Sequence, residues 1–244
     1  TWRISGANTF GGTVTVNAGT LEIAGGSAIP DSNAVNLANA GSNGSAPGGA
    51  TLRVVNSETI GTLAGAIGSK VNIDSGATLT LVNGSTVFQG AIIGSGGLTQ
   101  SNNAAGTARI TTLSSANSSY TGVTSIIGGA GAANRLDVSK LANGGANSSI
   151  GAATTAASNL VIDTGTNNGG LRFVGVADSA TNRLLSIGAG SGAASIWADG
   201  QVYGNSTPTL AFTDTGAVGT INSGARTLTL RGANRGDNIF NPIH

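Results

Sequence analysis

The chain has 244 residues, of which 41 are glycine, with a net charge of +1, 9% charged residues, 4% aromatic residues and no cysteine. Its eleven basic residues are scattered, whereas nucleic-acid binding needs clustered Lys and Arg to displace counterions from phosphate. No run of residues approaches the roughly 20 apolar residues of a membrane helix. Leu, Ile, Val and Phe make up about 23% of the chain, above the level typical of disorder, so we expect a folded protein.

The beginning of the chain does not resemble a signal peptide, because Thr1-Trp2-Arg3 is not followed by an apolar core. Without an initiating Met, the chain is expected to be a processed product or a slice of a longer protein. The absence of cysteine removes a disulfide framework and thiolate zinc sites. It also fits export of an unfolded chain through a narrow pore, and nothing in the sequence calls for a cofactor.

Short segments with an apolar residue at every second position recur along the whole chain. This alternation places the apolar side chains on one face of a strand. The segments are Thr13–Val16, Thr20–Ile23, Thr51–Val54, Lys70–Ile73, Thr78–Leu81, Arg135–Val138, Asn159–Ile162, Leu171–Val174, Thr209–Phe212 and Thr227–Leu230. Each is closed by Gly, Asn, Asp or Ser, which favour sharp turns, and no window carries a convincing helical stripe. The sequence therefore predicts an all-β fold.

Three related Ala-Asn motifs begin at Gly6, Ser115 and Gly232, spaced by 109 and 117 residues. We interpret the chain as one continuous rod with modules of about 110 residues at 1–108 and 109–225 and the start of a third at 226–244. Strands of a β-sandwich are usually joined by hairpins, and the Asn-Gly pairs here do not lie between two flanking strands. The spacing of the strands also drifts, which a solenoid tolerates because each coil need only match its neighbours.

The segment from Trp2 to Ile23 resembles the autotransporter-associated β-strand repeat. The matching residues are Ile4, Gly6, Asn8, Thr9, Phe10, Gly12, Thr13, Val16, Gly19, Thr20 and Leu21. A second copy matches at Leu113, Asn117, Tyr120, Thr121, Gly122, Thr124 and Ile126, and a third at Leu230, Gly232 and Asn234. The resemblance implies a passenger region at the bacterial surface, coiled as a right-handed parallel β-helix and commonly adhesive or structural.

A parallel coil should be right-handed on physical grounds as well, because parallel crossovers overwhelmingly have that hand. At roughly 20 residues per coil, we expect about a dozen coils. Leu, Ile, Val and Phe should fill the inside and Thr, Ser and Asn the outside. Asn8, Asn17 and Asn117 are candidates for amide ladders between coils.

Some β-helices are carbohydrate-active enzymes, so the carboxylates need weighing. Glycoside cleavage requires two carboxyl groups roughly 5–9.5 Å apart. The pairs Asp163 with Asp178 and Asp199 with Asp214 could meet on neighbouring coils, although turn capping explains isolated Asp residues more simply. The only histidine is His244, the last residue, which argues against a histidine base. We interpret Gly188-Ala189-Gly190 as an accidental likeness to a dinucleotide motif, because no helix is expected after it.

Arg235-Gly236-Asp237 is the candidate binding turn, because this tripeptide on an exposed turn can engage integrins. The competing interpretation is that Gly236 serves the backbone of a turn in the third repeat.

We therefore expect an extracellular structural or adhesive rod of a bacterial surface or secreted protein, not an enzyme. A polysaccharide lyase or hydrolase is the alternative. Two kinds of partner stay open: a host-surface or matrix ligand, and further copies stacked end to end through uncapped strand edges. No nucleic-acid partner and no membrane insertion of this segment are expected.

Overall fold

A computed structural model describes residues 1–38, 49–101, 108–128, 134–164, 169–188, 193–201, 207–221 and 223–242. Within these ranges the chain is a parallel β-helix, built from short strands and one 3-10 turn, η1 (Ala157–Asn159). Every pairing between the named strands is parallel. This confirms the all-β solenoid that the sequence predicts.

Four parallel sheets form the walls of the rod. The long sheet contains β2 (Val14–Val16), β4 (Ala34–Leu37), β7 (Thr62–Gly65), β10 (Ser85–Phe88), β13 (Arg109–Leu113), β15 (Asn134–Val138), β17 (Gly169–Phe173), β20 (Ala193–Ala198) and β23 (Thr227–Arg231). The N-terminal sheet contains β1 (Trp2–Ser5), β3 (Thr20–Ala24), β5 (Thr51–Val54), β8 (Lys70–Ile73) and β11 (Ala91–Gly94). The back sheet contains β6 (Glu58–Ile60), β9 (Thr78–Leu81), β12 (Gly97–Ser101), β14 (Thr124–Ile127), β16 (Leu160–Asp163), β19 (Ser186–Ile187) and β22 (Gly219–Thr220). The C-terminal sheet contains β18 (Ser179–Thr181), β21 (Leu210–Phe212) and β24 (Ile239–Phe240).

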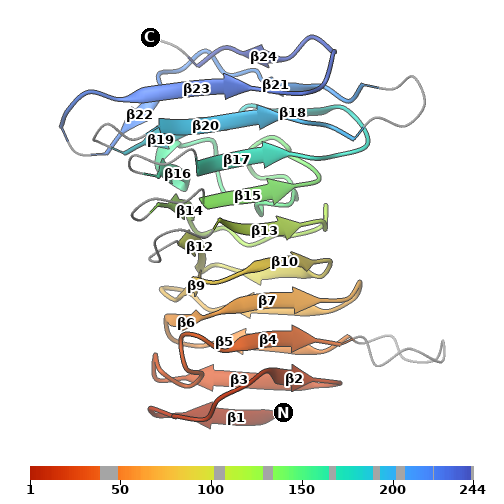
Figure 1. Ribbon diagram of the computed structural model, residues 1–244, viewed down its shortest axis with the longest axis vertical. Coiled ribbons are helices and arrows are strands. Elements are labelled where there is room, and N and C mark those ends of the chain that lie inside the picture. The colour runs from red at the N-terminus through yellow and green to blue at the C-terminus, as the bar shows by residue number, and fades with distance from the viewer. Residues whose placement is uncertain are drawn as a thin grey trace.

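The coil is right-handed, with the N-terminus at one end of the rod and the C-terminus at the other (Figure 1). In that view the strands of the long sheet run to the right on the near side, and the chain returns leftward behind them as it climbs. In the described part of the chain the long sheet has nine strands. From Val14 to Thr227 eight steps separate these strands, so one coil takes about 27 residues rather than the expected 20. Fewer coils than a dozen therefore fit.

Aliphatic side chains stack in register to form the core. In the N-terminal sheet, Leu21, Leu52, Val71 and Ile92 are aligned from β3 to β11. Leu52, Val71 and Ile92 are completely buried and Leu21 is nearly so. The alternation in each strand thus becomes a continuous apolar column, because every coil repeats the inward positions of the coil below.

A larger residue in one coil is balanced by a smaller one in the next. Phe88 and Gly65 are in register in β10 and β7, and Phe88 is fully buried. A Cβ atom at residue 65 would lie 2.6 Å from the Phe88 ring, so only glycine fits below this phenylalanine. At this position the side chains of neighbouring coils are therefore complementary in volume as well as in polarity.

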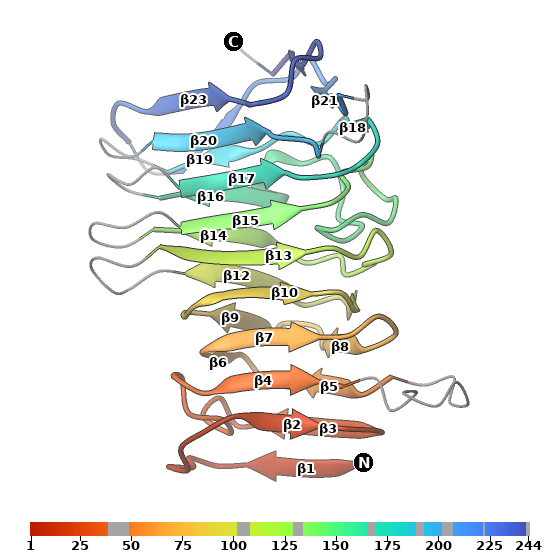
Figure 2. The same cartoon turned by 45° about the vertical axis from the view of Figure 1, so that its right-hand side comes forward.

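The wall that the chain forms between the long sheet and the back sheet changes midway along the rod. The N-terminal sheet ends at β11 and the C-terminal sheet begins at β18. Between them, residues 139–156 form a lateral bulge, visible as green loops on the right of Figure 2. The bulge is tied to β18 by Ser179, whose Oγ accepts from the Leu141 N–H at 2.7 Å and donates to the Leu141 carbonyl at 2.9 Å.

The repeat motifs do not occupy equivalent walls of the rod. The strand that precedes the first motif is β1 in the N-terminal sheet, whereas β13 and β23, which precede the second and third, belong to the long sheet. The division into modules of about 110 residues stays a prediction. The Asn8 amide donates to the Ala28 carbonyl at 3.0 Å, so at this position the contact between coils is amide to backbone instead of amide to amide.

Candidate functional site

The outer face of the long sheet carries a column of charged and aromatic residues in its C-terminal half. Asp137, Arg172, Trp197 and Arg231 are in register in β15, β17, β20 and β23. Because side chains alternate along a strand, all four lie on the solvent side of the wall while their neighbours fill the core. Residues separated by 25 to 35 positions in the chain thereby become neighbours.

Ion pairs connect this column across three coils. Asp137 Oδ1 accepts from Arg135 Nε at 2.6 Å, and its Oδ2 pairs with Arg172 at 3.4 Å. Arg172 Nε also lies 2.7 Å from Asp199 Oδ2. The Asp199 Oδ1 atom accepts from the backbone N–H of Ala233 at 2.6 Å, which ties the next coil to the network. The Asp137 side chain is only 7% exposed, and two guanidinium groups balance its charge. Without them, burial of this charge would be costly.

Trp197 completes this group, which we call the outer cluster (Arg135, Asp137, Arg172, Trp197, Asp199 and Arg231). The guanidinium carbon of Arg231 lies 5.6 Å from the centroid of the indole ring and that of Arg135 lies 6.0 Å from it. Both distances allow a cation–π attraction. Because Arg135 belongs to β15 and Arg231 to β23, the indole links coils that are not adjacent.

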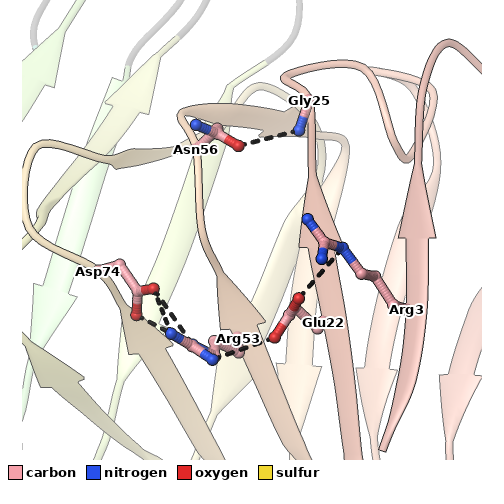
Figure 3. A network of polar contacts seen from close by, with 6 residues as sticks. All are labelled: Arg3, Glu22, Gly25, Arg53, Asn56 and Asp74. Carbon is pink, nitrogen blue, oxygen red and sulfur yellow. Dashed lines mark hydrogen bonds and ion pairs between the residues drawn. The ribbon is translucent and has the colours of Figure 1, made fainter.

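A second network, the N-terminal ladder, crosses the outer face of the N-terminal sheet (Figure 3). Arg3, Glu22 and Arg53 are in register in β1, β3 and β5. Glu22 bonds Arg3 at 3.2 Å and Arg53 at 3.1 Å, and Arg53 reaches Asp74 at 2.8 Å. The hydrogen bonds with Asp74 raise the pKa of Arg53. Opposite charges alternate along the axis, so Glu22 lies between two arginines and Arg53 between two carboxylates.

The candidate tripeptide lies in the loop between β23 and β24, which we call the RGD loop (residues 232–238), at the C-terminal end of the rod (Figure 1). Arg235 and Asp237 are exposed and Gly236 is half-buried. A Cβ atom on Gly236 would collide with the Thr209 side chain, so glycine is required where the loop crosses the coil below. This supports the backbone interpretation for the glycine but does not account for its two charged neighbours.

The carboxylates considered for catalysis lie on different walls. Asp163 ends β16 in the back sheet, whereas Asp178 precedes β18 in the C-terminal sheet. A separation of 15 residues is about half a coil, so it turns the chain to another face instead of bringing it to a neighbouring coil. Asp178 accepts from the Thr209 N–H at 2.8 Å, 31 residues further along the chain, so its carboxylate joins two neighbouring coils.

The second pair is also used in structural bonds. Asp199 belongs to the outer cluster, and Asp214 Oδ1 accepts from the Gly216 N–H at 2.7 Å, two residues further along. Asp199 follows β20 in the long sheet and Asp214 follows β21 in the C-terminal sheet, so the second pair, like the first, is divided between two walls. His244 and residues 189–192 of the glycine-rich segment lie outside the described residues.

Two buried polar residues inside the rod have unusual surroundings. The Glu58 carboxylate accepts from the Ile29 N–H at 2.7 Å, and its burial raises its pKa. The Arg183 guanidinium, almost fully buried, donates to the carbonyls of Ile150 at 3.0 Å and Ala153 at 2.8 Å. Burial lowers the pKa of Arg183. Its carbonyl partners belong to the lateral bulge, so Arg183 connects the bulge to the coil that contains β18.

Two hollows mark the ends of the described core. One of 400 Å³ is lined by Ile4, Val14 and Leu21 among others, and one of 510 Å³ by Ile196, Phe212 and Phe240 among others. Core-facing side chains of the first and last described coils form much of their walls. The larger hollow also has a polar edge formed by Arg231, Asn234 and Asn238, of which the two asparagines bond to each other and to the coil below.

Over the described residues, no three His, Cys, Asp or Glu side chains are grouped closely enough to hold a metal ion. In the same residues, we find no helix long and apolar enough to span a membrane.

Sequence reasoning missed the outer cluster and the N-terminal ladder. Both consist of outward residues that are isolated in the sequence, and only the coil register makes them neighbours. The available signal was the charged or aromatic residue at an outward position of consecutive strands, as in Glu22 and Arg53. Using it requires knowing which strands are stacked.

Together, the fold and these surfaces define a class of protein: a right-handed β-helical shaft whose outer charges link its coils. Comparison with known proteins agrees with this class. Over 240 residues, 95% of the chain, it is 39% identical to the protein described as Adhesin BmaC autotransporter from Brucella suis biovar 1 (strain 1330). The chain spans about 6% of the length of that relative. No family model matches the chain, and no solved structure matches it.

The chain is thus related, along nearly its whole length, to an autotransporter passenger-type protein. The relationship indicates a protein of the bacterial cell surface or the extracellular space.

Proposed function

We propose that the chain forms part of the shaft of a bacterial surface adhesin, holding binding surfaces away from the cell. The observation that carries this proposal is the unbroken long sheet, in which β2 to β23 pair in parallel along the rod. The similarity to an adhesin over 95% of the chain supports the same function and a non-enzymatic role. The ion pairs along the outside suit a shaft, because they oppose separation of its coils.

Adhesion can be tested with the purified chain. Beads coated with the chain are expected to attach to cultured host cells in larger numbers than beads coated with albumin. A matched control is the same chain after heat denaturation, which keeps the composition but removes the solenoid. Equal attachment of native, denatured and albumin-coated beads would contradict an adhesive role for this segment.

Association end to end is a further part of the proposal. The core-facing side chains Ile4, Val14 and Leu228 are only partly buried in the terminal coils. Coils of a longer chain or of a second copy would cover them, since an open parallel sheet can accept another strand. Light scattering over a wide concentration range tests this: a mass that rises with concentration supports stacking, and a constant monomer mass contradicts it.

A further inference from the structure

We propose that the RGD loop is a receptor-recognition element: Arg235 pairs with a carboxylate of a cell-surface receptor and Asp237 completes the coordination of a divalent cation held by that receptor. The inference rests on the proposed adhesive function and specifies the chemistry of the partner. Carboxylate oxygens are ligands preferred by Mg²⁺ and Ca²⁺. A guanidinium group pairs with carboxylates in a directional, bidentate manner.

The first support is the distribution of the charged residues between structural bonds and the free surface. It contains 11 basic and 10 acidic residues in 244, and most of those described are engaged in structural bonds. The N-terminal ladder, the outer cluster, Asp178, Arg183 and Asp214 are examples. Within the described residues the Arg235 and Asp237 side chains have no ion pair or hydrogen bond with the fold. Two opposite charges, two residues apart and exposed, are therefore not explained by stability.

The second support is the rigidity of the loop base. Asn238 Nδ2 donates to Asn234 Oδ1 at 2.7 Å, and Asn234 Nδ2 donates back to Asn238 Oδ1 at 3.2 Å. This reciprocal amide pair closes the loop on either side of the tripeptide. Asn238 Nδ2 also donates to the Gly236 carbonyl at 3.1 Å, which fixes the centre of the tripeptide.

The amide pair is itself anchored to the coil below. Asn234 Nδ2 donates to the Pro208 carbonyl at 2.7 Å, and Asn238 Oδ1 accepts from the Leu210 N–H at 2.9 Å. The loop is thus held at both ends by the body of the rod while its two charged side chains face solvent. Holding a loop in one conformation before binding lowers the entropy lost on binding, which favours recognition of a short motif.

The test uses the 244-residue chain immobilised on a surface and a purified integrin ectodomain that recognises Arg-Gly-Asp peptides, in Mn²⁺ and in EDTA. We expect saturable binding in Mn²⁺, loss of binding in EDTA and competition by a soluble Arg-Gly-Asp peptide. Asp237→Glu, which displaces the carboxylate by one methylene, is expected to lower the affinity at least tenfold. Asp31→Glu, at another exposed turn, is the matched control and is expected to leave the affinity unchanged.

Asn238→Ala tests the role of the amide pair and is expected to weaken binding severalfold. Because this substitution could also disturb the last coil, circular dichroism is measured on the same sample, and Asp237→Glu remains the deciding variant. Receptor binding that is unchanged by Asp237→Glu, or the absence of receptor binding while beads still attach to cells, overturns this inference and leaves the adhesive function standing. Failure of both receptor and cell binding overturns the two together.

Discussion

Arg172 and Asp199 are 27 residues apart in the chain, yet Arg172 Nε lies 2.7 Å from Asp199 Oδ2 on the outside of the rod. The spacing is about one coil, so the ion pair joins a residue to its counterpart in the next turn. Asp137, on the other side of Arg172, extends the connection to a third coil. The coils of the C-terminal half are thus held from outside as well as by their core.

Removing Arg172 should weaken this half of the rod. Arg172→Ala leaves Asp199 without its guanidinium partner and Asp137 with only one, and we expect a loss of about 1–3 kcal/mol in the free energy of unfolding. Arg3→Ala is the matched control: Arg3 is 63% exposed and makes one ion pair, so its loss should cost less than about 0.5 kcal/mol. Urea denaturation followed by circular dichroism measures both. Equal effects of the two substitutions would contradict a special role for the partly buried network.

Gly65 and Phe88 should behave as a coupled pair. Gly65→Ala places a methyl group against the Phe88 ring, and we expect it to cost about 1–3 kcal/mol. In the background Phe88→Leu, which makes room, the same substitution should cost clearly less. A double-mutant cycle on unfolding free energies measures the coupling. Gly11→Ala, where a Cβ atom meets nothing within 4 Å, serves as control and should be close to neutral.

Arg183 should be essential to the lateral bulge. Arg183→Met keeps the bulk but leaves the carbonyls of Ile150 and Ala153 without their donor, which should cost about 2–4 kcal/mol. Exposed Arg235→Met should change stability by less than about 0.5 kcal/mol. Hydrogen exchange followed by mass spectrometry should show the loss of protection first in residues 139–156. Uniform loss along the whole rod would mean that Arg183 supports the core in general.

Glu58 should make the stability depend on pH. Its burial raises its pKa in the folded chain above the unfolded value, so between these two values the folded chain binds more protons. The contribution of Glu58 to stability is therefore present at acidic pH and is lost as the pH rises through the folded pKa. We expect the wild type to gain stability relative to Glu58→Gln as the pH is lowered from neutral towards the unfolded pKa.

Urea midpoints at a series of pH values measure this difference. Glu58→Gln still accepts from the Ile29 N–H and should be at least as stable as wild type at neutral pH. Glu58→Ala leaves that buried N–H unpaired and should lose about 1–3 kcal/mol at every pH. Parallel pH profiles for wild type and Glu58→Gln would show that Glu58 does not titrate over this range.

The alternation of residues such as Leu52 with Arg53, and of Leu79 with Thr80, was sufficient to predict strands and their inward faces. Strands Thr51–Val54, Lys70–Ile73 and Thr78–Leu81 have the predicted bounds. Strands without clean alternation escaped prediction. Two examples are β6, whose inward Glu58 is polar, and β12, in which every residue is buried.

The sequence by itself determined the regularly alternating strands and the solenoid class, and it placed Arg235-Gly236-Asp237 in a turn, because these depend on local periodicity and on turn residues. The number of residues in each coil, and hence the partners across coils, was decided only by the tertiary structure. Turns of different length shift the register by amounts that no local pattern encodes. For that reason Asp163 and Asp178 lie on different walls, whereas Arg172 and Asp199 are bonded.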